Sequence, residues 1–297
     1  MLSPIPTRRS RLRYWVQAAA FDKTALPKQA PFLRNILLAL LIAPQLWLIP
    51  TGHAEDSAVG KPSVMRNLVP AKQVEAQAAQ QYRQLLQEAN RKKALAPDNH
   101  PQVKRLRSIA RKLTPHAERF NPRAKEWQWE VNLIGSKQIN AFCMPGGKIV
   151  FYTGILEQLK LTDDEVAMIM GHEIAHALWE HARERMAKSF ATNIGATLLG
   201  ELVGGGNYST LFRMGGDLLT LKFSRSDESE ADIVGLELAA RAGYDPRAGI
   251  SLWQKMAAAS KGKPLEFLST HPSGETRIED IQRQLPKVMP LYEANRG

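Results

Sequence analysis

The sequence has little of several features that mark particular classes of protein. Cys143 is its single cysteine, which excludes a disulfide within the chain. The apolar run at residues 36–50 is broken by Pro44 and Gln45 and is shorter than the ~20 residues of a membrane-spanning helix. The chain also lacks internal repeats and any Lys/Arg tract interleaved with aromatic residues. We therefore expect no nucleic-acid partner.

More than half of the net charge of +11 lies in the first 54 residues. This segment contains seven Lys/Arg and one acidic residue, whereas the rest of the chain has 33 basic and 28 acidic residues. The apolar run follows the basic region, and Gly52 and Ala54 stand at −3 and −1 of a cleavage point before Glu55. This pattern is typical of an export signal with a long basic n-region. We interpret residues 1–54 as that signal, with an uncleaved membrane anchor as the alternative.

Beyond this signal, the sequence predicts an α+β protein that is mostly helical with a small β-sheet. Residues 55–98 are interpreted as a linker and an N-terminal helix, and residues 99–297 as one domain. Segments 127–135 and 139–154 are rich in aromatic and β-branched residues and predict strands. The second segment is expected to fold back at the turn formed by Pro145–Gly147.

The segment LTDDEVAMIMGHEIAHALWEHARE predicts a helix of about 25 residues that begins at a capping box of Thr162 and Glu165. His172 and His176 are one turn apart on the same face, so their imidazoles can bind one ion. Glu173 lies about 100° around the helix, where it can touch water at the ion without binding the ion itself. This H-E-x-x-H spacing predicts the active-site helix of a zincin-like metalloprotease.

Two imidazoles leave a catalytic zinc site one protein ligand short. His181 points elsewhere on the helix and is expected at the partly solvated surface, not on the metal. A later helix, with Ser226 as its expected N-cap, offers Glu228 and Asp232 on one face. We predict that Glu228 binds the metal and that Asp232 accepts an imidazole N–H, whereas Glu230 is expected in solvent. The alternative is an ordinary acidic helix start.

Four separated segments, HEIAHALWEH, FSRSDESEADIVG, NAFCMPGGKIVFYTGIL and STHPSGETRIEDI, together resemble the HtpX-like and CAAX-prenyl-protease-like zinc endopeptidases, family 48 of the metallopeptidases. The resemblance spans about residues 100–285. It implies one Zn²⁺ per chain, held by His172, His176 and Glu228. It also implies that Glu173 is the catalytic glutamate.

The same resemblance brings His271 and Arg277 near the active site. Either side chain is then a candidate for stabilising the oxyanion, and the competing role for His271 is to plug the zinc. The pattern is closer to exported bacterial members and mitochondrial quality-control relatives than to multi-spanning members. It implies hydrolysis of unfolded or misassembled envelope proteins in the periplasm, with association with membrane proteins left open. The alternatives are an assembly chaperone with a closed zinc site and a membrane-anchored protease facing the periplasm.

The strand at Lys148–Tyr152 is expected to offer its edge to an extended peptide, with an ordinary core hairpin as the alternative. Cys143 is expected to fill space in this hairpin rather than to act as a nucleophile. The apolar stretch 191–203 predicts a packed or lid helix, and the glycines at 204–206 predict a hinge. The residues assigned to substrate binding are Asn140, Lys148, Ile149, Val150 and Phe151.

Overall fold

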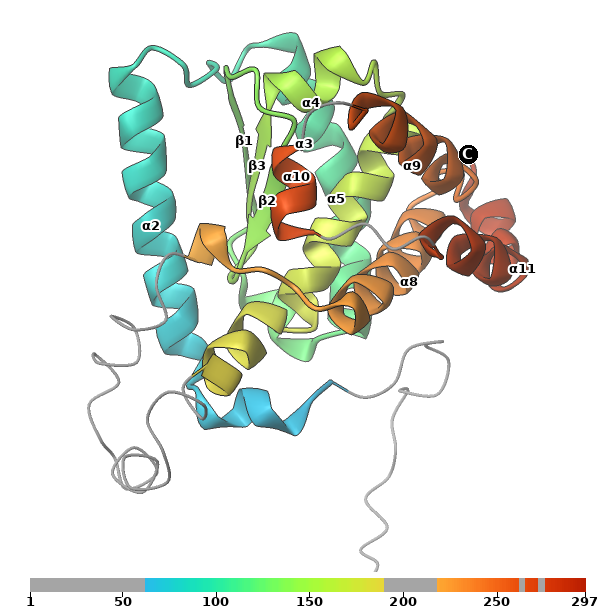
Figure 1. Ribbon diagram of the computed structural model, residues 1–297, viewed down its shortest axis with the longest axis horizontal. Helices are drawn as coiled ribbons and strands as arrows, with labels where there is room; N and C mark the ends of the chain where they lie inside the picture. The colour runs from blue at the N-terminus through green and yellow to red at the C-terminus, as the bar shows by residue number, and fades with distance from the viewer. Residues whose placement is uncertain (1–61, 190–217, 262–264, 272–275) are drawn as a thin grey trace, which may run out of the picture. The chain divides into compact units, whose positions relative to one another are not determined.

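The computed structural model describes residues 62–189, 218–261, 265–271 and 276–297, all within one compact unit, His53–Gly297 (Figure 1). The expected signal, lid helix and glycine hinge lie outside these residues. Within them, no helix is long and apolar enough to cross a membrane. The helices are α2 (Ala71–Arg91), α3 (Pro101–Leu113), α4 (Thr153–Gln158), α5 (Asp163–Leu178), α8 (Arg225–Arg241), α9 (Ala248–Ala259), α10 (Glu266–Thr270) and α11 (Arg277–Asn295), with 3-10 helices η1 (Val64–Leu68), η2 (Thr114–Arg119), η3 (Pro122–Glu126) and η4 (Leu218–Thr220).

The described residues form one three-stranded sheet in the order β1 (Glu130–Ile134), β3 (Lys148–Tyr152), β2 (Ala141–Met144). β3 pairs in parallel with β1 and antiparallel with β2. The predicted turn between β2 and β3 is confirmed, since Gly146 and Gly147 have φ of 85° and 79°, which glycine adopts without a steric penalty. The prediction that β3 is an edge strand is wrong, because both of its sides are already hydrogen-bonded.

The sheet separates two apolar layers, as the strand residues alternate between them. Ile149 and Phe151 belong to the main core with α3, α5, α8 and α9. Val150 faces the other way, into a smaller cluster with Val74 and Tyr82 of α2. Figure 1 shows α2 along one face of the sheet and α5 with α8 beyond the other. The mostly helical α+β architecture expected from the sequence is confirmed.

Helix α5 begins as predicted but ends earlier. Thr162 N–H donates to Glu165 Oε2 over 2.8 Å, and Glu165 N–H donates to Thr162 Oγ1 over 3.3 Å, which completes the capping box. The helix ends at Leu178, whose carbonyl accepts from Asn121 Nδ2 over 2.8 Å. Glu180 then adopts a left-handed φ of 56°, and residues 181–189 are helical again. The expectation of one helix of about 25 residues is therefore wrong.

Helix α8 also has a capping box, and its N-cap lies two residues earlier than predicted. Ser224, not Ser226, is the N-cap: its Oγ accepts from Asp227 N–H over 3.3 Å, and Asp227 Oδ2 accepts from Ser224 N–H over 2.7 Å. Because the Ser224 hydroxyl and the Asp227 carboxylate each accept from the other residue's amide, both amides at the helix start have partners. Ser226 could not form this reciprocal pair with Asp227. The predicted stop at Gly243 is confirmed by its φ of 79°.

Helices α5 and α8 cross backbone against backbone at a pair of glycines. A Cβ on Gly171 would lie 2.7 Å from the Gly235 carbonyl oxygen, and a Cβ on Gly235 would lie 2.6 Å from the backbone nitrogen of His172. Atoms cannot approach that closely, so neither position accepts a side chain at this separation. Glu228 lies two turns before Gly235 on the same helix, so this crossing sets its distance from His172.

We predict that Gly235→Ala destabilises the protein by about 1–3 kcal/mol, the usual cost of overpacking a tight interior. The added methyl group meets rigid backbone and must push α5 and α8 apart. The measurement is the free energy of unfolding in urea.

Gly249→Ala is the matched control, because Gly249 is also helical and its added Cβ would meet only side-chain ends of Ile281 and Leu236 at 3.4–3.6 Å. Alanine favours a helix over glycine by about 1 kcal/mol, so this variant should be as stable as the unaltered protein or more so. Equal stabilities of the two variants would contradict the account of the crossing.

Candidate metal centre

The described part of the chain brings four metal-binding side chains to one buried point. Ligand atoms of His172, His176, Glu228 and His271 all lie within 4.8 Å of one another. They come from α5, from α8 and from the residue that follows α10. Glu228 lies 43 or more positions away from each histidine along the chain, so the fold, not local sequence, assembles the group. The three ligands predicted from the sequence are among the four.

The spacing of these atoms fits a tetrahedral zinc ion. His172 Nε2 and His176 Nε2 are 3.1 Å apart, and each is 3.4 Å from an oxygen of Glu228. A tetrahedron whose corners lie about 2.0–2.1 Å from its centre has edges of about 3.3 Å. Nitrogen and carboxylate donors are also the ligands that zinc prefers. The chemistry and the spacing of the donors therefore fit the group.

Glu173 lies beside this cluster without joining it. Its Oε1 is buried and has no hydrogen-bond partner among the described residues, and it is 3.6 Å from His271 Nε2. The backbone of Cys143 in β2 lies beside the same carboxyl group and lowers its pKa, although burial outweighs this effect. An unsatisfied buried oxygen is costly unless a ligand or water uses it. This placement agrees with the role predicted for Glu173.

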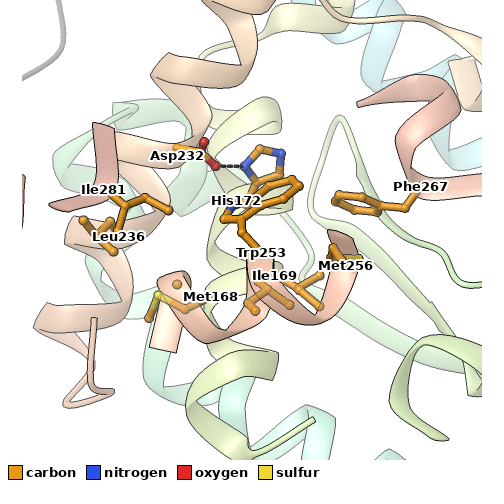
Figure 2. Close-up of a pocket in the computed structure, with 11 residues that line it drawn as sticks. Met168, Ile169, His172, Asp232, Leu236, Trp253, Met256, Phe267 and Ile281 are labelled. Carbon is orange, nitrogen blue, oxygen red and sulfur yellow. Dashed lines mark hydrogen bonds and ion pairs between the residues drawn. The ribbon is translucent and has the colours of Figure 1, made fainter. Parts of the chain in front are cut away.

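A second carboxylate holds the far side of His172. Asp232 Oδ1 lies 2.9 Å from His172 Nδ1, on the ring nitrogen that faces away from the cluster (Figure 2). Such an acceptor fixes the ring and leaves Nε2 free for a metal. The predicted contact of Asp232 with an imidazole is therefore present, because Glu228 and Asp232 are one turn apart on α8 as the sequence indicated.

Arg277 contacts the carboxylates of Asp232 and Glu228 and is not one of the four clustered donors. Its Nε donates to Asp232 Oδ2 over 2.6 Å and its Nη1 to Glu228 Oε2 over 2.8 Å. Its guanidinium group also stacks over Trp253 at 3.7 Å. A buried cation bound to both carboxylates positions them and compensates their charge. This placement favours a positioning role over the predicted stabilisation of an oxyanion.

His271 fills the fourth corner of the cluster. Its Nδ1 lies 3.0 Å from Glu228 Oε1 and 3.4 Å from His172 Nε2. The ring stacks on Phe267 at 4.5 Å and 15°. Backbone hydrogen bonds anchor this segment, from Phe267 N–H to the Ile139 carbonyl and from Phe223 N–H to the carbonyl of Thr270, each 3.1 Å long. The fourth donor position is therefore held by the protein itself.

The pKa values of Glu228 and Glu173 are shifted in opposite directions. Burial opposes ionisation of Glu228, yet hydrogen bonds from the three surrounding imidazoles hold its pKa below the usual value. Burial raises the pKa of Glu173, and the nearby imidazoles of His271 and His172 only partly oppose this rise. One carboxyl group is thus kept charged, as a ligand must be, while the other is prone to accept a proton.

The two imidazoles of α5 also differ. Burial would lower the pKa of His172, but its hydrogen bonds to Asp232 and Glu228 raise it to about 9. Burial holds the pKa of His176 well below its usual value. The surroundings thus favour the protonated form of His172 and the neutral form of His176 when no metal is bound. Zinc must displace the proton of His172, so acid weakens zinc binding.

One residue near the site was misplaced by sequence reasoning, and the solvent exposure predicted for a second is only partial. His181, expected at the partly solvated surface, is only 1% exposed, and its Nδ1 lies 2.9 Å from His176 Nδ1. Glu230, expected in solvent, lies 3.1 Å from His181 Nε2 with 36% of its side chain exposed. The turn at Glu180 swings His181 back against α8, and helical periodicity gave no signal of that turn.

Four of the five residues assigned to substrate binding lie in the central strand β3, and Asn140 directly precedes the edge strand β2. Ile149, Val150 and Phe151 are fully buried in the two apolar layers. Lys148 is buried and donates to the Gln128 carbonyl over 2.6 Å and to Glu130 Oε1 over 2.5 Å. Asn140 Oδ1 accepts from the adjacent Ala141 N–H. The assignment fails because it required β3 to be an edge; the alternative of a core hairpin is correct.

An apolar pocket adjoins His172 and Asp232 (Figure 2). Residues of α5, α8, α9 and α11 line it, and Phe267 of α10 points toward it. The apolar side chains that define it include Ile169, Leu236, Trp253, Met256 and Phe267.

Comparison with known protein families agrees with the site. The family model of "Peptidase family M48" matches residues 101–285, which include every member of the cluster. Zinc is the cofactor of this family, and the donors assembled here suit it.

Three relatives illustrate the range of the similarity. "Mitochondrial metalloendopeptidase OMA1" of Arabidopsis thaliana is 40% identical over 149 residues, or 50% of this chain and 30% of that protein. "Metalloprotease LoiP" of Escherichia coli is 29% identical over 205 residues, or 68% and 78%. "Beta-barrel assembly-enhancing protease" of Yersinia pestis is 28% identical over 171 residues, or 53% and 35%. The chain thus spans about a third of the plant and Yersinia proteins. With the family model covering most of its length, the chain belongs to peptidase family M48.

Proposed function

We propose that the protein is a zinc-dependent endopeptidase that hydrolyses unfolded or misassembled envelope proteins. The observation that carries the proposal is the joint cluster of two imidazoles from α5 and one carboxylate from α8, with Glu173 beside it. His172, His176 and Glu228 are the proposed ligands of one zinc ion per chain. When bound, zinc supplies Lewis-acid chemistry, which polarises a carbonyl group and acidifies water.

Glu173 performs the proton transfers in this mechanism. Its carboxylate accepts a proton from the attacking water and delivers it to the nitrogen of the leaving amine. A general base works best when its pKa lies near the working pH, and burial raises the pKa of Glu173 in that direction. The backbone of Cys143 in β2 lies beside the carboxyl group and favours its charged form.

The structure corresponds to a closed state in this proposal. Four protein donors complete a zinc site and leave no position for water. His271 is the donor that must leave, since it lies on the short segment that follows α10 while the other three lie on long packed helices. Movement of α10 breaks its backbone hydrogen bonds to Ile139 and Phe223.

Strand β2 replaces β3 as the proposed docking edge for substrate. Tyr152 N–H donates to the Asn140 carbonyl, so along an antiparallel pair the backbone groups of Ala141 and Cys143 point away from β3. An extended peptide can pair with that side at Ala141 as an added strand, while the Cys143 backbone faces Glu173; such pairing gives affinity with little sequence preference. Such a peptide would run past Glu173.

The name of one bacterial relative supports an envelope role. It describes a protease that enhances β-barrel assembly, whereas the other bacterial relative is named only as a metalloprotease. We propose that the protein acts in the periplasm, with a membrane-anchored form facing it as the alternative. Association with membrane proteins belongs to the same proposal.

An assembly chaperone remains the second candidate, and the four-donor closed cluster favours it. A deletion strain that carries Glu173→Gln separates the two. Full rescue identifies the chaperone, and failure to rescue identifies the protease.

Glu173→Gln should leave zinc bound and lower the rate of casein cleavage by about 10²–10⁴-fold, because general base catalysis is lost while the ligands are unchanged. The measurements are zinc content by elemental analysis and the initial rate of cleavage. Undiminished turnover would remove Glu173 from the mechanism.

Glu228→Ala should reduce the zinc content well below one per chain, because it removes the carboxylate donor and leaves only imidazoles, and Arg277 then keeps Asp232 as a partner but loses Glu228. Glu237→Ala on the same helix is the control: Glu237 pairs with Arg241 over 2.8 Å, away from the cluster. Elemental analysis of both purified variants measures the effect. Unchanged stoichiometry in Glu228→Ala would disqualify Glu228 as a ligand.

His271→Ala should retain zinc and raise basal peptidase activity severalfold, because it vacates the fourth donor position. The rate on a quenched fluorescent peptide measures this effect. A fall in rate with zinc retained would instead assign His271 to stabilisation of the oxyanion.

A further inference from the structure

We propose that His181 and Glu230 form a hydrogen-bonded relay that holds His176 in the tautomer and orientation required to bind zinc. The inference rests on the proposed role of His176 as a ligand. His176 Nε2 faces the cluster, whereas its Nδ1 lies 2.9 Å from His181 Nδ1. His181 Nε2 lies in turn 3.1 Å from Glu230 Oε2. The relay thus runs from the cluster to the rim of the molecule.

The placement of protons along the relay follows from its chemistry. A neutral imidazole that binds zinc through Nε2 carries its proton on Nδ1, so His176 must donate from Nδ1. A contact between two nitrogens holds a single proton, so His181 Nδ1 must accept. The proton of His181 is then on Nε2, from which it donates to the carboxylate of Glu230. Glu230 therefore selects the His181 tautomer that accepts from His176.

The opposite arrangement would disable the ligand. If His181 donated from Nδ1, Nδ1 of His176 would have to accept, and the His176 proton would move to Nε2, where zinc must bind. In that arrangement His181 Nε2 would also direct a lone pair at the Glu230 carboxylate, which accepts but does not donate. Both contacts therefore favour the same, zinc-competent tautomer.

The local fold is arranged around these contacts. Phe223 lies against the His176 ring at 4.0 Å and 31°, which restricts its rotation. Glu180 adopts a left-handed φ of 56°, uncommon for a residue other than glycine, and Arg183 holds its carboxylate over 2.8 Å. This turn ends α5 and places the His181 ring against the His176 ring. A continuous helix would instead have directed His181 to a different face from His176.

The relay parallels the support of the other imidazole. His172 is held directly by Asp232, whereas His176 is held by Glu230 through an intervening histidine. Both carboxylates belong to α8, which also carries Glu228. A single helix therefore supplies one ligand and the outer support of both others. Outer partners of this kind are typically worth 10–100-fold in metal affinity.

The test measures zinc affinity by competition with a chromophoric chelator, without any activity assay. His181→Phe keeps an aromatic ring but removes the acceptor, and its affinity should fall about 10–100-fold. His181→Asn places an amide oxygen near the position of Nδ1 and should lose less. Glu230→Leu should lower affinity severalfold. His116→Phe, in η2, is the control and should match the unaltered protein.

A spectroscopic signature accompanies these affinities. The chain has seven histidines, so long-range ¹H–¹⁵N spectra of zinc-loaded, histidine-labelled protein can assign each tautomer. His181 should carry its proton on Nε2. Observation of the Nδ1–H tautomer in the zinc-loaded protein would overturn the relay.

The outcomes separate this inference from the proposed function. A folded His181→Phe variant with unaltered affinity overturns the relay alone, provided that His176→Ala loses zinc. If His181→Phe does not fold, Glu230→Leu decides, because that side chain is 36% exposed, and unaltered affinity there overturns the relay. Retention of zinc by His176→Ala overturns the ligand set and the relay together.

Discussion

The close contact of α5 with α8 is the constraint on which the rest of the site depends. Without a side chain at Gly171 or Gly235, the two backbones touch next to His172. Asp232 lies about one turn before Gly235 on α8, and Glu228 lies one turn before Asp232. Both side chains face the imidazoles. A zinc ligand set tolerates errors of only a few tenths of an ångström. The two glycines set that distance with backbone atoms, which cannot change rotamer.

The same contact creates an electrostatic requirement that α11 meets. Two carboxylates buried near one another repel and are costly to ionise. Arg277, the first residue of α11, donates to both and is itself stacked on Trp253. Removing either side of such a buried group strands the other charge. The C-terminal helix is therefore tied to the metal centre by charge, although it carries no proposed ligand.

In the proposed mechanism, closure of the site by His271 would link the metal centre to substrate access. The segment Leu265–His271 covers the start of β2 through the Phe267–Ile139 hydrogen bond and fills the fourth corner of the cluster. Displacing it would expose the β2 edge, the apolar pocket beside His172 and the fourth donor position together. Movement of this short segment would therefore open the proposed docking edge, the pocket and the fourth donor position at the same time.

Sequence reasoning succeeded where the determining interactions are local. The capping box at Thr162, the pairing of His172 with His176 and that of Glu228 with Asp232 all follow from spacing within one helix. It failed where distant contacts decide. The end of α5 depends on Asn121 binding the Leu178 carbonyl. The burial of His181 follows from that turn. The central position of β3 depends on its pairing with β1, from which it is separated in sequence by β2. The positions of His271 and Arg277 were indicated only by the family resemblance.

The central claim is that one zinc ion is held jointly by α5 and α8. Anomalous X-ray diffraction at the zinc absorption edge, from crystals of the zinc-loaded protein, tests it most directly. The account predicts one peak per chain, about 2.0–2.2 Å from Nε2 of His172, Nε2 of His176 and a carboxylate oxygen of Glu228. A peak elsewhere, or one bound by the imidazoles with Glu228 out of reach, would contradict it.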